Sequence, residues 1–122
     1  MAKTDFLKLS RLAAKFSDEK KGEDISLLNI RRLSSVADYF LIVTADSTVQ
    51  VNAIKEYIIK SFKETENRTV LHRDGGYSSG WAVLDYGGLI IHIMLPETRR
   101  LYSLEKIWSD ARKTAWQPSD ES

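Results

Sequence analysis

Two histidines and an aspartate are the side chains that would first suggest catalysis. His92 lies in an apolar run a few residues after Asp85. If this segment folds as a hairpin, the two residues are diagonal neighbours about 7–8 Å apart between Cα atoms, within reach of an Asp–His pair. Serine-based hydrolysis also needs a placed nucleophile, and the chain has no Gly-x-Ser-x-Gly turn to provide one. The plainer interpretation is that His92 is a strand histidine held by a hydrogen bond and that His72, beside a turn, is on the surface.

Metal and phosphate sites need patterns that the chain lacks. It has no cysteine and none of the usual zinc-ligand spacings. Gly75-Gly76 leads into a strand and not into a helix N-terminus, which is where phosphate loops lead. The turn Ala45-Asp46-Ser47 does open a helix, but Asp46 would already occupy its positive end. We therefore expect no catalytic residue, no cofactor and no metal, and we interpret the chain as a non-enzyme.

Side chains typical of protein interfaces gather toward the end of the chain. Trp81, Tyr86, Arg99 and Tyr102 fall within or just after one predicted hairpin. Trp, Tyr and Arg are enriched among the few residues that dominate binding energy. Each has a plainer interpretation as well: Trp81 as core, Tyr86 as core with its hydroxyl at the rim, and Arg99 as a solvent charge. Surface recognition is the stronger prediction.

The hairpin that would position these residues turns at Gly87-Gly88, a pair that readily takes the positive φ angles of a two-residue turn. Tyr86 would then oppose Leu89. Alternation gives one apolar face, expected on the core, and one mixed face, expected to meet helix, solvent or a partner. The apolar face would hold Ala82, Leu84, Tyr86, Leu89, Ile91, Ile93 and Leu95. The mixed face would hold Trp81, Val83, Asp85, Ile90, His92 and Met94. A register shift of one residue would exchange the two faces.

Composition limits the remaining function classes. A chain of 122 residues with 43% hydrophobic and 29% charged residues is typical of one globular domain. Its net charge of +1 argues against non-specific nucleic-acid binding by the chain as a whole, because such binding neutralises several phosphates, but it leaves local charged patches open. No apolar run approaches the ~18 residues of a membrane span, and the N-terminus lacks a secretory signal. We expect a cytoplasmic protein with one domain over residues 1–117 and a disordered tail over 118–122.

Hydrophobic spacing predicts an α+β fold in the order α-β-β-α-β-β-β-α, with a mixed sheet of about five strands and helices packed on it. The first helix would be capped by Thr4 or Asp5 and run to about residue 20, and the second, capped by Ser47 with Gln50, to about residue 64. Strands are expected over 25–32, 39–44 at the sheet centre and 69–73 at an edge, and a loop over 74–80 precedes the hairpin.

The helical stripes of the second and last helices are also predicted. In the second helix Val51, Ile54, Ile58 and Phe62 would face the core, with Lys55, Glu56, Lys60 and Lys63 toward water. A last continuous helix would start at Glu97 or Thr98, end near Trp116, and turn Leu101, Leu104, Ile107 or Trp108, and Ala111 inward.

A set of short motifs resembles the ribosomal silencing factor family, also called Iojap-like proteins, over about residues 5–110. The matching pieces are Lys21-Gly22-Glu23-Asp24-Ile25, Asp38-Tyr39-Phe40, Ser47-x-x-Gln50-Val51-x-Ala53-Ile54, Asp74-Gly75, Trp81-x-x-Leu84-Asp85-Tyr86-Gly87, Ile91-His92, Pro96-Glu97-x-Arg99 and Tyr102-x-Leu104-Glu105-x-x-Trp108. No single piece is diagnostic, but the set is highly specific. The departures from the family pattern are Asp74, Gly88 and the pair Ala45-Asp46.

The resemblance implies a fold similar to nucleotidyltransferases without catalysis. It further implies binding to the large ribosomal subunit through large-subunit ribosomal protein fourteen at the intersubunit face. Such binding would block joining of the small subunit and repress translation, with a link to large-subunit assembly. A secondary rRNA contact and a monomeric or homodimeric state stay open. A nucleotidyltransferase-like enzyme and a homodimeric scaffold are the alternative hypotheses.

Eight residues form the predicted partner-binding site on the mixed face and its flanks. Trp81 and Met94 would be apolar anchors, Asp85 and Glu97 would meet basic groups, and Arg99 and Tyr102 would line the edge. Tyr86 and His92 complete the set.

Overall fold

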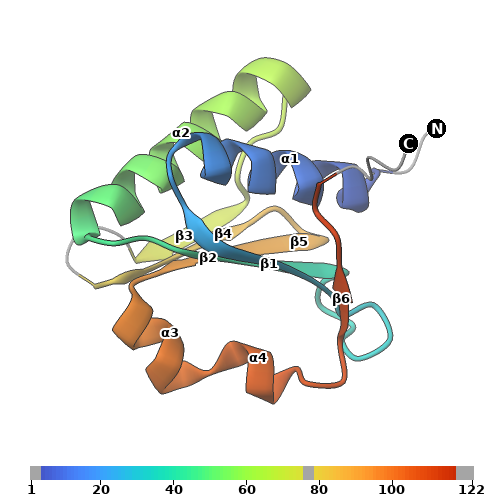
Figure 1. Ribbon diagram of the computed structural model, residues 1–122. Helices are drawn as coiled ribbons and strands as arrows, with labels where there is room; N and C mark the ends of the chain where they lie inside the picture. Colours follow the sequence, from blue (N-terminus) through green and yellow to red (C-terminus); the bar gives the residue numbers. More distant parts are fainter. Residues whose placement is uncertain (1–3, 76–78, 118–122) are drawn as a thin grey trace.

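The computed structural model describes residues 4–75 and 79–117, and in it a single sheet separates two layers of helices. Helices α1 and α2 lie on one face of the sheet, and α3 and α4 lie on the other (Figure 1). The elements are α1 (Phe6–Glu19), β1 (Glu23–Asn29), β2 (Tyr39–Thr44), α2 (Thr48–Glu66), β3 (His72–Gly75), β4 (Trp81–Asp85), β5 (Leu89–Met94), α3 (Pro96–Tyr102), α4 (Leu104–Ile107) and β6 (Arg112–Thr114). The tail predicted over 118–122 and the middle of the loop predicted over 74–80 lie outside the described residues.

The sheet is mixed, as predicted, and has the strand order β3-β4-β5-β2-β1-β6. Strands β2 and β5 are parallel, whereas the four other neighbouring pairs are antiparallel. The β2 strand has the predicted bounds and lies in the middle of the sheet, and β3 lies at an edge. The α+β class and the order of the first eight elements are confirmed, and β6 is a sixth strand that the hydrophobic pattern did not predict.

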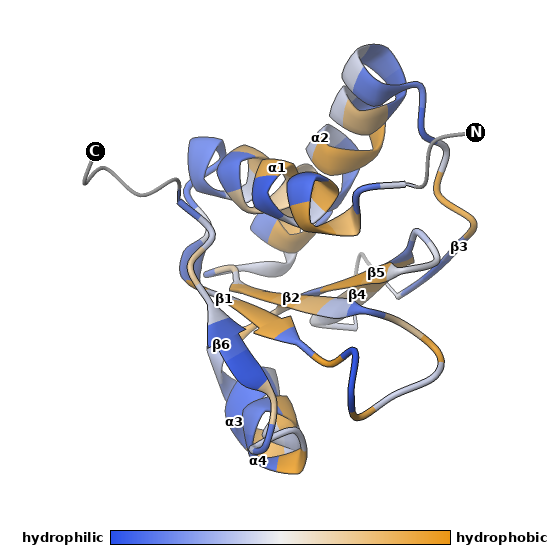
Figure 2. Cartoon of the chain, turned by 90° about the vertical axis from the view of Figure 1, so that its right-hand side faces the viewer, coloured by the Kyte–Doolittle hydropathy of each residue, from blue (hydrophilic) through white to orange (hydrophobic). Residues whose placement is uncertain are grey.

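The hairpin of β4 and β5 has the predicted register. Trp81 pairs with Met94 and Asp85 with Ile90, and the Tyr86 amide donates to the Leu89 carbonyl at 2.8 Å. The predicted apolar face is buried against α1 and α2, with Leu95 partly buried at its end. Figure 2 shows apolar colour along the strands between the two helical layers.

Both long helices begin at the predicted caps. Asp5 accepts from the Lys8 amide at 3.0 Å, and Ser47 Oγ accepts from the Gln50 amide at 3.1 Å. Gln50 also reaches beyond its own helix, because its Nε2 donates to the backbone carbonyls of Lys20 and Lys21. This side chain therefore ties the end of α1 to the start of α2.

The predicted core stripe of α2 is confirmed, since Val51, Ile54, Ile58 and Phe62 are all fully buried. Lys55 was expected on the wet side, and this prediction is wrong. Lys55 is only 8% exposed, and its ammonium group forms an ion pair with the Glu56 carboxylate at 3.3 Å. A lysine can bury its long apolar stem while its charge stays near the surface.

The last predicted helix does not exist as one element. Ser103 adopts a left-handed conformation with φ 47°, ends α3, and separates it from α4. The chain then turns back and β6 pairs with β1, placing Arg112 beside Asn29. As a result Leu101 and Ile107 face solvent, whereas Leu104 and Trp108 pack inward as predicted.

A second, smaller core lies on the mixed face of the hairpin, beneath α3 and α4. Its buried members are Leu28, Ile30, Ala37, Ile42 and Met94. Partly buried aromatic residues, among them Phe40, Trp81 and Trp108, pack around it. The mixed face is thus covered by helix, which was one of the environments predicted for it. In the described part of the chain, no helix combines the length and apolar character needed to cross a bilayer.

Candidate protein-docking site

Helices α3 and α4 expose an unusual concentration of large apolar side chains. Leu101, Tyr102 and Ile107 are 77%, 50% and 67% exposed. These side chains are exposed because of where the helices begin and end. Pro96 begins α3 just after β5, and Ser103 then breaks the helical stripe that would have turned Leu101 and Ile107 inward. We call Leu101, Tyr102, Ile107 and the adjoining Trp81 the α3–α4 ledge. Exposed apolar groups of this kind mark interaction surfaces more often than scattered single residues do.

A chain of tilted and edge-on aromatic contacts connects the ledge to the second core. The centroids of the Tyr102 and Trp81 rings lie 4.7 Å apart, and Trp81 Nε1 donates to His92 Nδ1 at 3.1 Å. His92 packs edge-on against Phe40 at 4.9 Å, and Phe40 does the same against Trp108 at 5.3 Å. Trp81 therefore links buried His92 to exposed Tyr102, and its hydrogen bond to His92 fixes its orientation.

His92 is a structural group in this arrangement. Its Nδ1 accepts a hydrogen bond, so the neutral ring carries its proton on Nε2, which is buried without a hydrogen-bond partner among the described residues. Burial lowers the pKa of His92 to about 4. Asp85 instead accepts from the Gly87 amide at 2.7 Å and closes the hairpin turn. No hydrogen bond joins Asp85 to His92 in the described structure, so the sequence-based Asp–His pair does not form.

Arg99 belongs to the scaffold and not to an accessible edge. Its side chain is 12% exposed, and it donates to Thr44 Oγ1 at 2.8 Å and Ser26 Oγ at 3.1 Å. The same guanidinium donates to the Asp24 carbonyl and forms an ion pair with Glu105. Hydrogen bonds from Arg99 hold the pKa of Glu105 below its usual value. This one side chain connects α3, α4, β1 and β2.

Besides His92 and Arg99, the other six predicted partner-binding residues separate into three groups. Met94 is fully buried in the second core, so it cannot serve as the exposed anchor that the sequence suggested. Tyr86 is 3% exposed, packs against Phe62 on the opposite face of the sheet, and has its pKa raised to about 12 by burial. Trp81 and Asp85 are partly exposed, and Glu97 and Tyr102 are exposed.

Leu101 and Ile107 were missed because the pattern was interpreted as one straight helix. With a break at Ser103, the same apolar residues no longer share a face. An apolar stripe on a helix that breaks leaves some of its residues exposed, and this is the signal that could have found Leu101 and Ile107. Using it requires knowing where the helix breaks.

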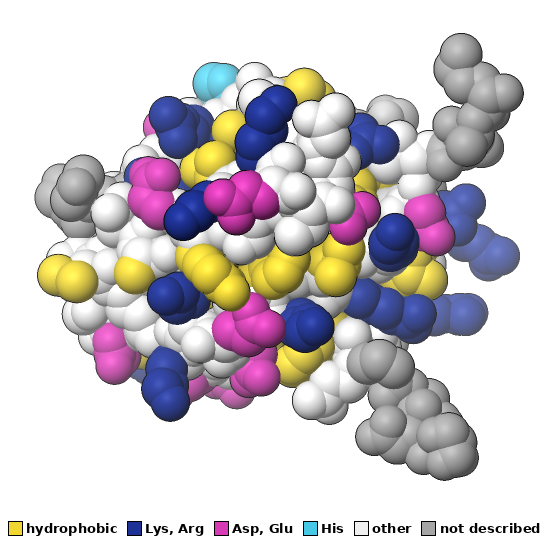
Figure 3. All heavy atoms as spheres, turned by 90° about the horizontal axis from the view of Figure 1, so that it is seen from above, with side chains coloured by type: hydrophobic (Ala, Val, Ile, Leu, Met, Phe, Trp, Pro, Cys, Tyr) yellow, Lys and Arg dark blue, Asp and Glu magenta, His cyan; other side chains and the backbone are white. Residues whose placement is uncertain are grey.

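The opposite layer of helices has a mixed surface. The outer face of α1 and α2 carries Lys and Arg interspersed with Asp and Glu around a narrow apolar band (Figure 3). Among the described residues, no group of three or more His, Asp or Glu side chains could hold a metal ion.

Comparisons with known proteins agree on one family. The family described as Ribosomal silencing factor during starvation matches residues 3–122. A ribosomal silencing factor of Bacillus subtilis is 37% identical over 101 residues, which cover 83% of this chain and 85% of the relative. A mouse protein named Mitochondrial assembly of ribosomal large subunit protein 1 is 32% identical over 93 residues, covering 75% of this chain and 41% of the relative.

A solved structure shows the same fold. The crystal structure of a Chromobacterium violaceum protein superposes with a TM-score of 0.83 and 28% identity, covering 95% of each chain. The arrangement of sheet and helices described above is therefore shared with an experimental structure.

Proposed function

The chain belongs to the ribosomal silencing factor family, and from that premise we propose that it binds the large ribosomal subunit through a ribosomal protein and keeps the small subunit from joining. The proposed target is large-subunit ribosomal protein fourteen at the intersubunit face. The chain would act by occupying space and not by catalysis, and the result would be repression of translation. The proposed compartment is the cytoplasm.

The observation that carries this proposal is the α3–α4 ledge. Of the seven large hydrophobic side chains that are exposed in the described structure, three lie between residues 101 and 107. Hot spots at protein interfaces are enriched in Trp and Tyr, and Trp81 and Tyr102 contact each other on this ledge. Because the His92 hydrogen bond already fixes Trp81, docking would cost less side-chain entropy than it would for a free tryptophan.

Charged side chains around the ledge would provide the polar rim of such an interface. Glu97, Arg100 and Lys106 are exposed on α3 and α4. Ribosomal proteins are rich in Lys and Arg, so Glu97, together with partly exposed Asp85, would supply the acidic contribution. The basic residues would meet acidic groups or remain in solvent at the rim, where single charges contribute little to affinity.

Co-sedimentation with separated ribosomal subunits tests the proposal with a matched pair of variants. Leu101 on the ledge and Leu71 before β3 are 77% and 72% exposed, so Leu101→Ala and Leu71→Ala remove the same atoms from similar exposure. We expect Leu101→Ala to weaken large-subunit binding about tenfold, which corresponds to about 1.4 kcal/mol. Leu71→Ala should bind like the parent chain. Equal binding by both variants would reject the ledge as the docking site.

The same apolar ledge also suits a second copy of the chain. Light scattering on the parent chain and on Leu101→Ala separates this outcome from the proposal. Loss of a dimer in the variant with unchanged subunit binding would assign the ledge to self-association and overturn the proposed docking surface.

A further inference from the structure

Three arginines line one cleft at the end of β1, away from the α3–α4 ledge residues. The cleft has a volume of about 740 Å³ and is bordered by β1, the loop that follows it, and β6. Arg31 and Arg32 follow β1 after one intervening residue, and β6 brings Arg112 opposite Asn29 across the antiparallel pair. The unpredicted strand β6 is therefore what completes this group.

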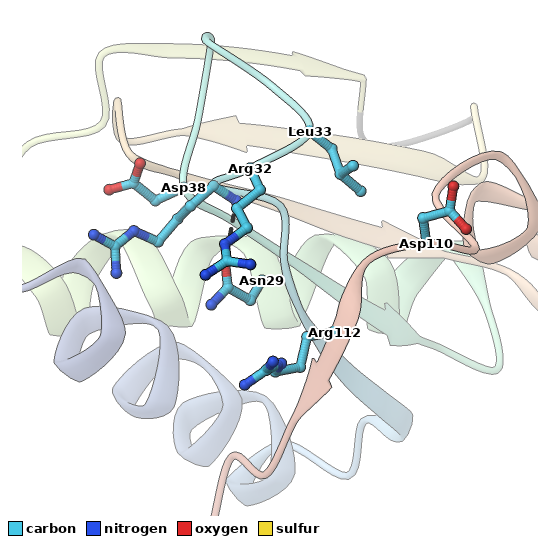
Figure 4. Close-up of a pocket in the computed structure, with 7 residues that line it drawn as sticks. Asn29, Arg32, Leu33, Asp38, Asp110 and Arg112 are labelled. Atoms are coloured by element: carbon cyan, nitrogen blue, oxygen red, sulfur yellow. Dashed lines mark hydrogen bonds between the residues drawn. The ribbon is translucent and has the colours of Figure 1, made fainter.

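The donors of the cleft are free to bind a ligand. None of the three guanidinium groups forms an ion pair or hydrogen bond with the described residues. Asn29 Oδ1 accepts from the Arg31 amide at 3.1 Å, which leaves its NH₂ group as a further donor. In Figure 4, Asn29 and Arg32 lie together and Arg112 points toward them from β6.

The two carboxylates of the cleft lie apart from this group. Asp38 and Asp110 also line the cleft, but Figure 4 places them on opposite sides of the Asn29–Arg32–Arg112 group. The centre of the cleft therefore offers only donors, and its ends offer acceptors. No aromatic ring of the described residues lines it, so this part of the chain provides no platform there on which a base could stack.

We propose that this cleft binds the sugar-phosphate backbone of RNA without reading its sequence. Guanidinium forks match pairs of phosphate oxygens, which suits the central donors. The ribose 2′-hydroxyl can donate to a carboxylate, which suits Asp38 and Asp110 and distinguishes RNA from both DNA and an acidic peptide. The inference rests on the proposed function only for the source of the RNA, which would be rRNA beside the docked ribosomal protein.

Fluorescence anisotropy with a labelled RNA hairpin and the DNA hairpin of the same sequence tests the proposal without any ribosomal protein. The parent chain should bind the RNA several-fold more tightly than the DNA. The double variant Arg32→Gln/Arg112→Gln should bind RNA at least tenfold more weakly. The slope of log Kd against log salt concentration should also decrease by roughly 1.5 in this variant, because each lost phosphate contact removes about 0.7–0.9 from that slope.

The matched control removes two exposed charges from α2. Lys60→Gln/Lys63→Gln has the same net charge as the cleft variant and should keep most of the RNA affinity. Circular dichroism should show that both double variants are folded, since all four residues are exposed.

Three results would overturn the proposal: equal loss in both double variants, equal affinity for RNA and DNA hairpins, or displacement of the RNA by poly-glutamate as readily as by unlabelled RNA. None of them bears on the ledge variants, whose binding to the ribosomal subunit is measured separately. Failure of the RNA site and failure of the proposed function are thus distinguishable.

Discussion

Replacing Arg99 with alanine should remove the tie that holds α3 and α4 on the sheet. Ser26 and Thr44 are 6% and 5% exposed, so their hydroxyl groups would be left buried without this donor. A buried polar group left without its hydrogen-bond partner costs about 1–3 kcal/mol.

The ion pair with Glu105 adds less. The Glu105 side chain is 40% exposed, so solvent screening reduces its contribution to about 0.5–1 kcal/mol. Because the bonds of one guanidinium are not additive, we expect Arg99→Ala to lower the free energy of unfolding by about 2–3 kcal/mol. In a domain of this size that change corresponds to a fall in Tm of about 6–15 °C.

Thermal and urea unfolding followed by circular dichroism measure this effect, and the neighbouring arginine provides the control. Arg100 is exposed, and its side chain forms no hydrogen bond or ion pair with the described residues, so Arg100→Ala should change the free energy of unfolding by less than about 0.5 kcal/mol. Equal stabilities of the two variants would refute the assignment of Arg99 as a structural tie.

Acid provides a second test of the same tie. Arg99 lowers the pKa of Glu105 in the folded chain, so the pair stabilises the fold above the ordinary carboxyl pKa and ceases to do so as the pH falls through the folded value. The difference in stability between the parent chain and Arg99→Ala should therefore shrink in acid. A difference that is constant from neutral pH to strong acid would show that Glu105 does not contribute.

Three further predictions concern the scaffold of the ledge and the helix junction. Trp81→Ala should abolish large-subunit binding in co-sedimentation while the far-ultraviolet circular dichroism remains that of a folded chain; retained binding would argue against the ledge. Burial lowers the pKa of His92 to about 4, so between about pH 6.5 and pH 4 only the unfolded chain takes up a proton on this residue. The free energy of unfolding should therefore fall as the pH drops through this range. A urea midpoint that stays constant across the range would contradict the buried neutral state of His92. Gln50→Ala should destabilise the fold by about 1–2 kcal/mol through loss of the bonds to the Lys20 and Lys21 carbonyls and of the acceptor for the Asp46 amide. In urea unfolding, Gln50→Glu should lie between Gln50→Ala and the parent chain, because a carboxylate keeps the acceptor but cannot donate to the two carbonyls.

The hairpin and the long helices could be predicted because local chemistry determines them. The turn at Gly87 requires a positive φ of 94°, which glycine provides, and alternation then fixes which side chains are buried. The caps Asp5 and Ser47 and the stripe of α2 likewise depend on residues within a few positions of one another. Their agreement with the structure follows from that locality.

The C-terminal part could not be predicted because its structure depends on distant contacts. The stretch over β6 is short and mostly charged, and it becomes a strand only by pairing with β1. Ser103 takes a conformation unusual for serine where α3 ends and α4 begins. Arg99 is separated by more than fifty positions from the Thr44 hydroxyl that it binds, so no local pattern identifies it as buried.

The parallel pairing of β2 with β5 has a consequence for how the fold forms. The β1–β2 and β4–β5 hairpins each consist of neighbouring segments, whereas the seam between them joins residues near position 40 to residues near position 90. Closing that long loop costs chain entropy before any contact across the seam forms, so high contact order should make the docking of the two hairpins the slow step. Because β2 and β5 are the central and most buried strands of the sheet, backbone amides along the seam should be the last to exchange with deuterium, while the outer edges of β3 and β6 exchange early.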